Sequence, residues 1–225
     1  MFGTNPIATQ RKPSDGFLVH SIFNTIQGEG PMAGHPAVFV RLAGCNLRCY
    51  WCDTEFDDGA KKMSYGDLCD AIFQARRLSP ASLVVLTGGE PMLQPIVDLT
   101  YAFRTQIETA GSVMRPVSRN TTIVCSPKTP RINEELIPQV SAWKYIIAPG
   151  EVADDDGLPC VSTQIKGENA YIYRPDKDHP APIYVQPRDD LDPVKNTINT
   201  KFAAEIAMRY GYRLSLQLHK ILDLP

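Results

Sequence analysis

The 225-residue sequence lacks three features that are typical of membrane, secreted and nucleic-acid-binding proteins. It contains no run of about 18 apolar residues that could span a bilayer, and its polar beginning, MFGTNPIATQRKPSDG, has no apolar segment of a secretory signal. It also contains no long run of Lys or Arg, and its formal net charge is −2. We therefore expect a cytoplasmic protein that acts neither in the membrane nor on a nucleic-acid backbone.

Disorder and internal duplication are not indicated either. The sequence shows no repeat, no low-complexity segment and no convincing linker, and 43% of its residues are hydrophobic, as in ordinary folded domains. A chain of this length can bury a substantial core without metals or disulfides. We expect residues 1–16, which have no apolar periodicity, to form a loose tail and residues 17–225 to form a single domain.

Short apolar or β-branched stretches that end near polar residues, glycine or proline recur along the chain and are typical of buried parallel strands. These stretches cover residues 37–42, 83–87, 106–109, 121–124, 143–147 and 183–186. Leu214, Leu216 and Leu218 alternate with other residues as in one more strand. The segment 149–182 has no such pattern, and we expect it to be irregular.

Two helices are predicted from their start and stop signals. Ser64-x-x-Asp67 resembles a capping box before a helical pattern that continues to Arg77. Asp192 and Pro193 form a cap and first turn for a second helix, which Gly211 would end.

Strands and helices in this order predict an α/β fold with parallel strands. A complete eight-stranded barrel needs about 250 residues, so we predict an incomplete, open (β/α) barrel with about six parallel strands and a reduced number of helices. Ligands collect at the carboxyl ends of such strands. The strand-end residues expected around one cavity are Cys45, Gly88, Glu108, Ser126 and Gln186.

Three of the six cysteines lie close together, as Cys45-x3-Cys49-x2-Cys52, directly after the first of these strands. In a reducing compartment this clustering favours metal ligation over disulfides. Soft sulfur selects zinc or an iron–sulfur cluster, and no fourth ligand follows at zinc-finger spacing. Three cysteines can hold three irons of a cubane cluster and leave the fourth iron open to a ligand. The pattern favours the cluster, and zinc with a further ligand stays an alternative.

The cysteine loop resembles that of the radical S-adenosylmethionine (SAM) superfamily, and Gly88-Gly89-Glu90-Pro91 resembles that superfamily's GGEP motif. From about residue 17 to the C-terminus, further stretches resemble the 7-carboxy-7-deazaguanine synthase family. These stretches are Gln27-Gly28-Glu29-Gly30, Cys52-Asp53-Thr54, Glu108-Thr109-Ala110-Gly111, Ser126-Pro127-Lys128, Gln186-Pro187 and Gln217-x-His219-Lys220. The resemblance implies a lyase that converts 6-carboxy-5,6,7,8-tetrahydropterin to 7-carboxy-7-deazaguanine with loss of ammonia, in the biosynthesis of queuosine-type 7-deazaguanines.

The same resemblance implies three cofactors: a [4Fe-4S] cluster on Cys45, Cys49 and Cys52, SAM at the open iron, and Mg²⁺ on Thr54. Reductive cleavage of SAM would give a 5′-deoxyadenosyl radical that abstracts hydrogen from C6 of the pterin. The resemblance further implies an external, flavodoxin-like electron donor and a homodimer.

Individual roles also follow from the resemblance. The residues that would contact the substrate are Ile26, Gln27, Gly28, Arg41, Thr109 and Pro225. In this set Arg41 would pair with the substrate carboxylate, and the chain-terminal carboxylate of Pro225 would reach the pyrimidine edge. The residues that would line the SAM pocket are Trp51, Glu90, Gly111, Ser126, Lys128 and Gln186. No side chain is assigned a catalytic role, and His35 and His219 are interpreted as structural.

One departure and two alternatives accompany this resemblance. The interval from Glu90 to Glu108 is short for a crossover between parallel strands, so we expect a truncated or irregular helix there. One alternative is an activating enzyme that makes a glycyl radical on a protein, although such enzymes often have extra cluster cysteines. The other is a non-enzymatic, zinc-binding interaction domain, which iron and zinc analysis would distinguish.

Overall fold

The computed structural model describes residues 7–78 and 82–225, so residues 1–6 of the expected tail lie outside the described residues. Residues 7–16 contact the loops that follow two strands: Ala8 N donates to Cys45 O at 2.8 Å, and Arg11 N donates to Leu93 O at 2.7 Å. In the described part of the chain, no helix is long and apolar enough to cross a membrane.

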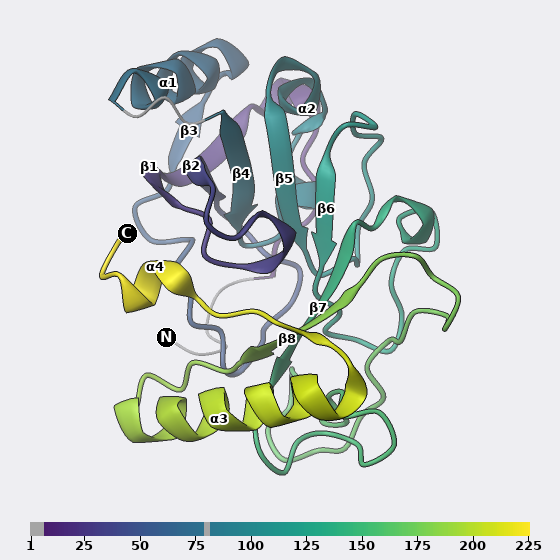
Figure 1. Ribbon diagram of the computed structural model, residues 1–225. Helices are drawn as coiled ribbons and strands as arrows, with labels where there is room; N and C mark the ends of the chain where they lie inside the picture. The colour runs from purple at the N-terminus through teal and green to yellow at the C-terminus, as the bar shows by residue number, and fades with distance from the viewer. Residues whose placement is uncertain (1–6, 79–81) are drawn as a thin grey trace.

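The strands of the described residues form one nine-stranded sheet in the order β3-β1-β2-β4-β5-β6-β7-β8-β9 (Figure 1). The strands are β1 (Phe17–Ile26), β2 (Pro36–Leu42), β3 (Lys61–Met63), β4 (Leu83–Gly88), β5 (Arg104–Thr109), β6 (Thr122–Cys125), β7 (Ala142–Ile147), β8 (Ile183–Pro187) and β9 (Arg213–Leu214). Strand β1 is antiparallel to β2 and β3, whereas β2 and β4 to β9 are mutually parallel. The predicted incomplete, open barrel is confirmed.

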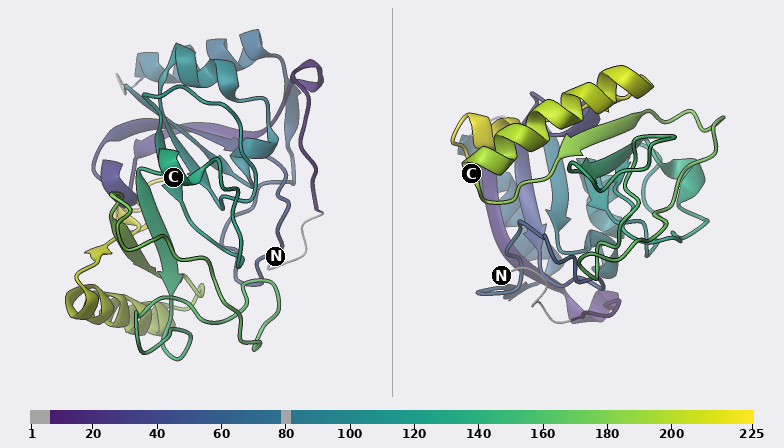
Figure 2. Two further views of the ribbon diagram at one scale, coloured as in Figure 1. Left: turned by 90° about the vertical axis from the view of Figure 1, so that its right-hand side faces the viewer. Right: turned by 90° about the horizontal axis from the view of Figure 1, so that it is seen from below.

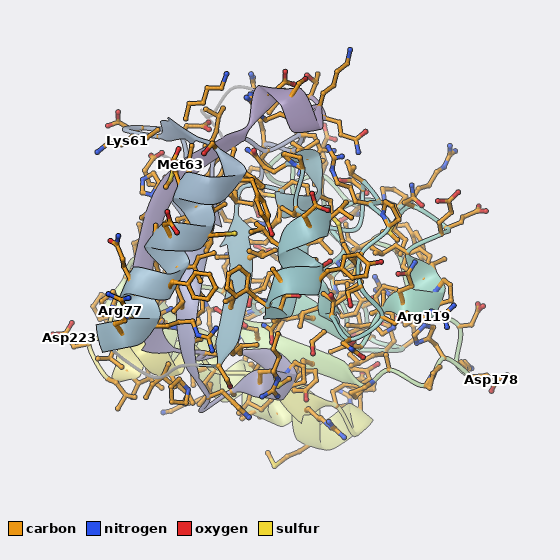
Figure 3. The ribbon with its side chains drawn as sticks, turned by 90° about the horizontal axis from the view of Figure 1, so that it is seen from above. Lys61, Met63, Arg77, Arg119, Asp178 and Asp223 are labelled. Carbon is orange, nitrogen blue, oxygen red and sulfur yellow. The ribbon has the colours of Figure 1, made fainter. Side chains whose placement is uncertain are left out.

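The helices are few, as predicted. The α-helices are α1 (Tyr65–Leu78), α2 (Val97–Ala102), α3 (Pro193–Tyr210) and α4 (Leu218–Ile221), and the short 3₁₀ helices are η1 (Pro13–Asp15), η2 (Gly30–Met32), η3 (Pro91–Leu93) and η4 (Ile137–Gln139). Helices α1 and α2 lie at one end of the molecule and α3 at the other (Figures 1 and 2). From above, α1 and α2 lie side by side in front of the sheet (Figure 3). The connections from β5 to β8, all within the described residues, contain no α-helix.

The ends of both long helices follow the predicted caps. Asp67 N donates to Ser64 Oγ at 3.1 Å, and Ser64 N donates to Asp67 Oδ2 at 3.2 Å, which completes the capping box. At α3, Asp192 Oδ1 accepts from the amides of the first turn, and Gly211 takes the left-handed conformation (φ 74°) that ends the helix. The short α2 confirms the truncated helix expected between Glu90 and Glu108.

The predicted strand through Leu214, Leu216 and Leu218 is wrong in its second half. Strand β9 ends at Leu214, and Leu218 begins α4. The physical reason is that the chain leaves the sheet to bond the loop after β1: Ser215 Oγ accepts from Gly30 N at 3.0 Å, and Leu218 N donates to Gly28 O at 3.3 Å. Those tertiary bonds outweigh the local alternation of leucines.

The sheet separates an apolar layer from the barrel interior. Alternate residues of the strands face outward into the main core, with Val40 and Leu86 fully buried there. The inner face has an apolar floor in which Phe39 and Val85 pack against Met32 of η2. Two residues further along the same strands, Arg41 and Thr87 line a cavity. The polar part of the interior therefore begins towards the carboxyl ends of the strands, where ligands bind in α/β folds.

Candidate active site

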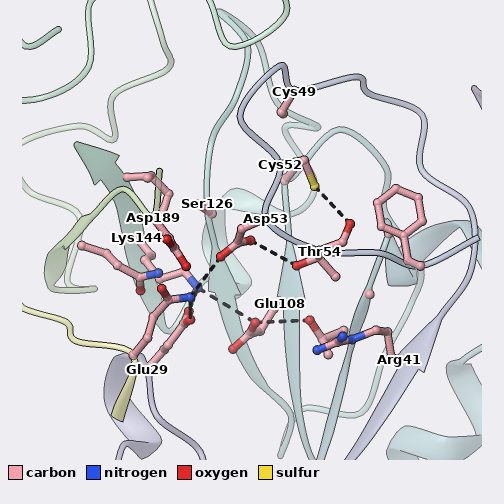
Figure 4. A pocket seen from close by; sticks show the side chains of 18 of the residues that line it. Glu29, Arg41, Cys49, Cys52, Asp53, Thr54, Glu108, Ser126, Lys144 and Asp189 are labelled. Carbon is pink, nitrogen blue, oxygen red and sulfur yellow. Dashed lines mark hydrogen bonds and ion pairs between the residues drawn. The ribbon is translucent and has the colours of Figure 1, made fainter. Parts of the chain in front are cut away.

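A cavity of about 440 Å³ occupies the interior of the barrel beneath the loops at the carboxyl ends of the strands (Figure 4). The predicted site residues that line it are Gln27, Arg41, Cys45, Cys49, Trp51, Cys52, Thr54, Glu90, Thr109, Ser126, Lys128, Gln186 and Pro225. Ile26, Gly28 and Gly111 do not line it. The structure thus gathers residues from both ends of the sequence around one space.

The loop after β2 carries three thiols on one side of this cavity. Cys45 Sγ accepts from Leu47 N at 3.4 Å, Cys49 Sγ accepts from Gln164 Nε2 at 3.3 Å, and Cys52 Sγ donates to Thr54 O at 3.6 Å. Burial raises the pKa of Cys45 to about 12 and also raises that of Cys52. Among residues 7–78 and 82–225, no three His, Cys, Asp or Glu side chains are grouped as ligands of a metal ion.

The chemistry of the three thiols fits an iron–sulfur cluster. Cys45, Cys49 and Cys52 are soft donors on a single loop, and the cavity that they face is large enough to be shared with a second ligand. These cysteines are therefore the residues that would hold such a cluster.

The GGEP loop packs backbone against backbone on the cysteine loop. Gly89 N donates to Leu42 O, and Glu90 N donates to Gly44 O, both at 2.9 Å. A Cβ atom at Gly89 would lie 2.0 Å from Gly44 O, so a side chain at this position would push the two loops apart. This contact fixes the distance between the cysteines and the end of β4.

The carboxylate of Glu90 joins the ends of β4 and β5. Glu90 is almost fully buried and accepts from Thr109 Oγ1 at 2.7 Å, Ala110 N at 2.8 Å and Met92 N at 3.0 Å. Burial raises the pKa of Glu90, and these hydrogen bonds act in the opposite direction. The bonds hold the loop after β5 against the cavity.

A half-buried lysine lies on the wall next to the cysteines. Lys128 Nζ lies 5.4 Å from the centre of the Trp51 ring and donates to Ser126 Oγ at 2.5 Å. Burial lowers the pKa of Lys128. On β8, Gln186 Oε1 accepts from Ser215 Oγ at 3.1 Å. This wall can donate hydrogen bonds to an anionic or polar ligand and stack an aromatic group on Trp51.

Arg41 is a cation that forms no ion pair with another described residue. It lies inside the barrel near the end of β2, and its guanidinium is 5.4 Å from the centre of the Phe23 ring. Its buried Nε has no hydrogen-bond partner in the described part of the chain. Burial lowers the pKa of Arg41, and the charges of Asp53 and Glu108 oppose that change. A ligand carboxylate would provide an ion-pair partner for the Arg41 guanidinium.

A charge network that lines the same cavity as Arg41 was not predicted from the sequence. Lys144 of β7 is ion-paired with Glu29, and its Nζ lies 3.9 Å from Glu108 Oε2 (Figure 4). Glu108 Oε1 also accepts from Gln27 Nε2 at 3.0 Å. The signal that could have revealed the network is Lys144 itself, a charge within the otherwise apolar run Trp143–Ile147.

The two histidines occupy different surroundings. His219 lines the cavity, and its buried Nδ1 has no hydrogen-bond partner among the residues that the structure describes. Burial lowers the pKa of His219. His35 does not line the cavity, and its Nδ1 lies 3.0 Å from Met32 O in the turn that precedes β2.

Comparisons with known proteins agree on one family. The chain is 45% identical to 7-carboxy-7-deazaguanine synthase of Rhodospirillum rubrum over 238 residues, which cover 100% of both chains. It is 38% identical to 7-carboxy-7-deazaguanine synthase of Rickettsia prowazekii, with 100% of this chain and 96% of that protein covered. The crystal structure of QueE from Escherichia coli matches with a TM-score of 0.67 and 26% identity, over 89% of this chain and 93% of that chain. No protein-family model matches the sequence.

Proposed function

The chain belongs to the 7-carboxy-7-deazaguanine synthase family, and we propose that the cavity around Cys45, Cys49 and Cys52 is its active site. The enzyme is a radical SAM lyase that converts 6-carboxy-5,6,7,8-tetrahydropterin to 7-carboxy-7-deazaguanine and releases ammonia, a step in queuosine-type biosynthesis. The glycyl-radical activating enzyme and the zinc-binding interaction domain are therefore set aside. The observation that carries the proposal is that three clustered thiols and Arg41, which has no ion pair among the described residues, face the same cavity.

A radical SAM enzyme uses a [4Fe-4S] cluster and SAM, and we assign both to the wall formed by the cysteine loop and the ends of β4 to β8. Cys45, Cys49 and Cys52 would hold the cluster. When bound, the cluster and SAM supply the radical that removes a hydrogen atom from the substrate. The residues assigned to the SAM pocket are Trp51, Glu90, Gly111, Ser126, Lys128 and Gln186. The support is the stacking surface of Trp51 and the donor Lys128 beside it.

The substrate is assigned to the interior of the barrel below the cysteine loop. Arg41 would hold its carboxylate, because this guanidinium has no carboxylate partner of its own among the described ion pairs. The other assigned contacts are Ile26, Gln27, Gly28, Thr109 and the chain-terminal carboxylate of Pro225. Gln27 and Pro225 line the cavity from opposite ends of the sequence, and Ile26 and Gly28 adjoin Gln27.

Thr54 is assigned as the protein ligand of Mg²⁺. Its side chain lines the cavity, and its Oγ1 donates to Asp53 Oδ1 at 3.2 Å. A hydroxyl that donates its proton in this way keeps its lone pairs for a hard cation such as Mg²⁺.

Three further assignments concern the setting of the enzyme. We place it in the cytoplasm, where its six free cysteines would stay reduced. We assign an external, flavodoxin-like electron donor, because amino-acid side chains do not supply the reducing electron.

We also assign a homodimer, supported by three apolar residues exposed at the start of α3: Leu191 (64%), Val194 (70%) and Ile198 (52%). Sedimentation should give twice the chain mass of 25.0 kDa.

The proposal is tested by an anaerobic assay with reductant, SAM, Mg²⁺ and carboxytetrahydropterin, which follows ammonia and the deazaguanine product. The reconstituted protein is expected to hold about four irons per chain. Cys49→Ala should abolish product formation. The matched control is Cys69→Ala, which removes a thiol of α1 that does not line the cavity and should leave turnover intact. Full turnover by Cys49→Ala would refute the assignment.

The magnesium assignment has a separate test. Thr54→Ala should raise the Mg²⁺ concentration for half-maximal activity by roughly tenfold or more, because it removes the assigned protein ligand. Thr54→Ser retains the hydroxyl and should stay close to the wild type. Identical Mg²⁺ titrations for Thr54→Ala and the wild type would exclude Thr54 as a ligand.

A further inference from the structure

The C-terminal segment, residues 217–225, lies beside the loop after β1 and lines the cavity through Gln217, His219, Lys220, Leu224 and Pro225. In Figure 1 this segment, in yellow, continues from the edge of the sheet beyond β8 to the vicinity of β1. Helix α4 packs directly on Gly28, where an added Cβ would lie 2.5 Å from His219 Nδ1 and 2.7 Å from Leu218 N. The segment is therefore closely fitted to the cavity, although α4 is only one turn long.

Two side chains of this segment hold it to other parts of the chain. Gln217 Nε2 donates to Glu29 Oε1 at 2.9 Å and lies 3.3 Å from Asp53 Oδ2. Lys220 Nζ donates to Asp53 Oδ2 at 2.7 Å and to Asp189 Oδ2 at 2.5 Å. One ammonium group thus bridges carboxylates from the loop after the third cysteine and from the end of β8.

Both carboxylates are themselves fixed by the chain around them. Asp189 Oδ1 accepts from Leu191 N at 2.8 Å and Asn196 Nδ2 at 2.7 Å, which anchors it to the start of α3. Asp53 Oδ1 accepts from Thr54 Oγ1. The side chain of Lys220 is 39% exposed, so its two ion pairs can break without unfolding of the barrel.

We infer that Lys220 is a positioning residue that fastens the C-terminal segment over the cavity and, through Asp53, joins that segment to the loop carrying Thr54. The inference deepens the proposed function and rests on it for the roles of Pro225 and Thr54. Closing the segment brings the terminal carboxylate to the cavity and orients Asp53 and Thr54 in the same step. A group that orients a metal ligand acts on metal affinity without touching the metal.

The first test measures hydrogen–deuterium exchange of residues 217–225 in the anaerobically reconstituted enzyme without substrate. Lys220→Met leaves Asp53 and Asp189 facing each other without a cation. We expect exchange in this segment to be roughly tenfold faster or more, because two charge-assisted hydrogen bonds are lost. Lys220→Gln should behave like Lys220→Met, and Lys220→Arg should restore protection.

The matched control is Lys201→Met, which neutralises an exposed lysine on α3 that does not line the cavity. It should leave exchange of residues 217–225 unchanged. Wild-type protection of this segment in both Lys220→Met and Lys220→Gln would overturn the inference. This test needs no turnover, so its result stands whether or not the enzyme makes the expected product.

The second test is kinetic. Lys220→Met should raise the KM for the pterin and the Mg²⁺ concentration for half-maximal activity by several-fold, with a smaller effect on kcat. Lys220→Arg should reverse both changes. A loss of kcat alone, with KM and the Mg²⁺ titration unchanged, would contradict a positioning role. If the wild type makes no product, the proposed function is refuted. The exchange test then decides by itself whether Lys220 holds the C-terminal segment over the cavity.

Discussion

Lys144 lies between two carboxylates inside the barrel, and its ion pair with Glu29 determines the charge of both partners. Burial alone would raise the pKa of Glu29, but the ion pair with Lys144 and the hydrogen bond from Gln217 lower it to about 2. Burial alone would lower the pKa of Lys144, but Glu108 and Glu29 raise it. Glu29 and Lys144 are therefore charged at neutral pH, directly beside the cavity assigned to the substrate.

Lys144→Met is expected to lower the free energy of unfolding by about 3–5 kcal/mol, because it leaves Glu29 and Glu108 buried without their cation. The measurement is urea denaturation of the metal-free chain at pH 7. The double variant Glu29→Gln, Lys144→Met removes the unpaired charge at Glu29 and should recover part of the loss. Equal stabilities of the single and double variants would contradict the unpaired charge of Glu29 as the cause of the loss.

Acid should weaken the fold partly through Glu29. The pKa of Glu29 falls from an ordinary value of 4.5 to about 2 on folding, so its stabilising contribution is complete above pH 4.5 and is lost as the pH falls towards 2. The full contribution is about 3 kcal/mol. Glu29→Gln removes it, and its free energy of unfolding should vary less with pH between 5 and 3 than that of the wild type. Parallel pH profiles for the two proteins would contradict this.

At the scale of the element, α3 depends on its N-cap. Asp192 accepts from the amides of Val194 and Lys195, and the helix packs on β8, whose end carries Gln186. Asp192→Ala should lower the free energy of unfolding by about 1 kcal/mol, whereas Asp192→Asn, which also caps, should cost much less. Urea midpoints of the two variants measure the difference. A destabilisation by Asn as large as that by Ala would mean that the charge, rather than the cap, stabilises the helix.

The elements that could be predicted from the sequence are those whose pattern is local. Strands β2 and β4 are buried along most of their length and carry continuous apolar runs. Strands β5 to β8 are marked by shorter apolar or β-branched stretches. Helix α1 and helix α3 carry their own caps. Strand β1 was not predicted, because its register shifts between Val19 and Ser21 and this irregularity interrupts the alternation of its side chains. Helix α4 depends on contacts with Gly28, which its own sequence does not encode.

The two parts of the candidate site also differ in whether they depend on local sequence or on tertiary contacts. The cysteine loop and the GGEP loop are contiguous motifs, so resemblance could find them. The network of Glu29, Lys144 and Glu108 comes from three separate segments, and Gln217 joins it from near the C-terminus. Which of these polar residues face the same interior depends on strand register and on the path of the loop after β1.

For the whole molecule, the open edge of the barrel determines how the cavity is enclosed. Strands β3 and β9 are the two edges of the sheet, and no strand pairing between described residues joins them. The loop of residues 27–35 closes the interior from below through η2, and the C-terminal segment bonds to that loop. Substrate enclosure thus depends on the last nine residues, 217–225, as well as on the strands.

Deletion of Leu224 and Pro225 should therefore raise the KM for the pterin strongly, roughly tenfold or more, because it removes a charged contact to the substrate. The iron content and the melting temperature should stay near wild type, since both residues are exposed. Leu224→Ala keeps the terminal carboxylate and is the matched control. Because Lys220 remains, exchange protection of residues 217–222 should survive the deletion. The deletion therefore tests the substrate contact of Pro225 independently of the ion pairs by which Lys220 holds the segment. Unchanged kinetics after the deletion would exclude Pro225 as a substrate contact.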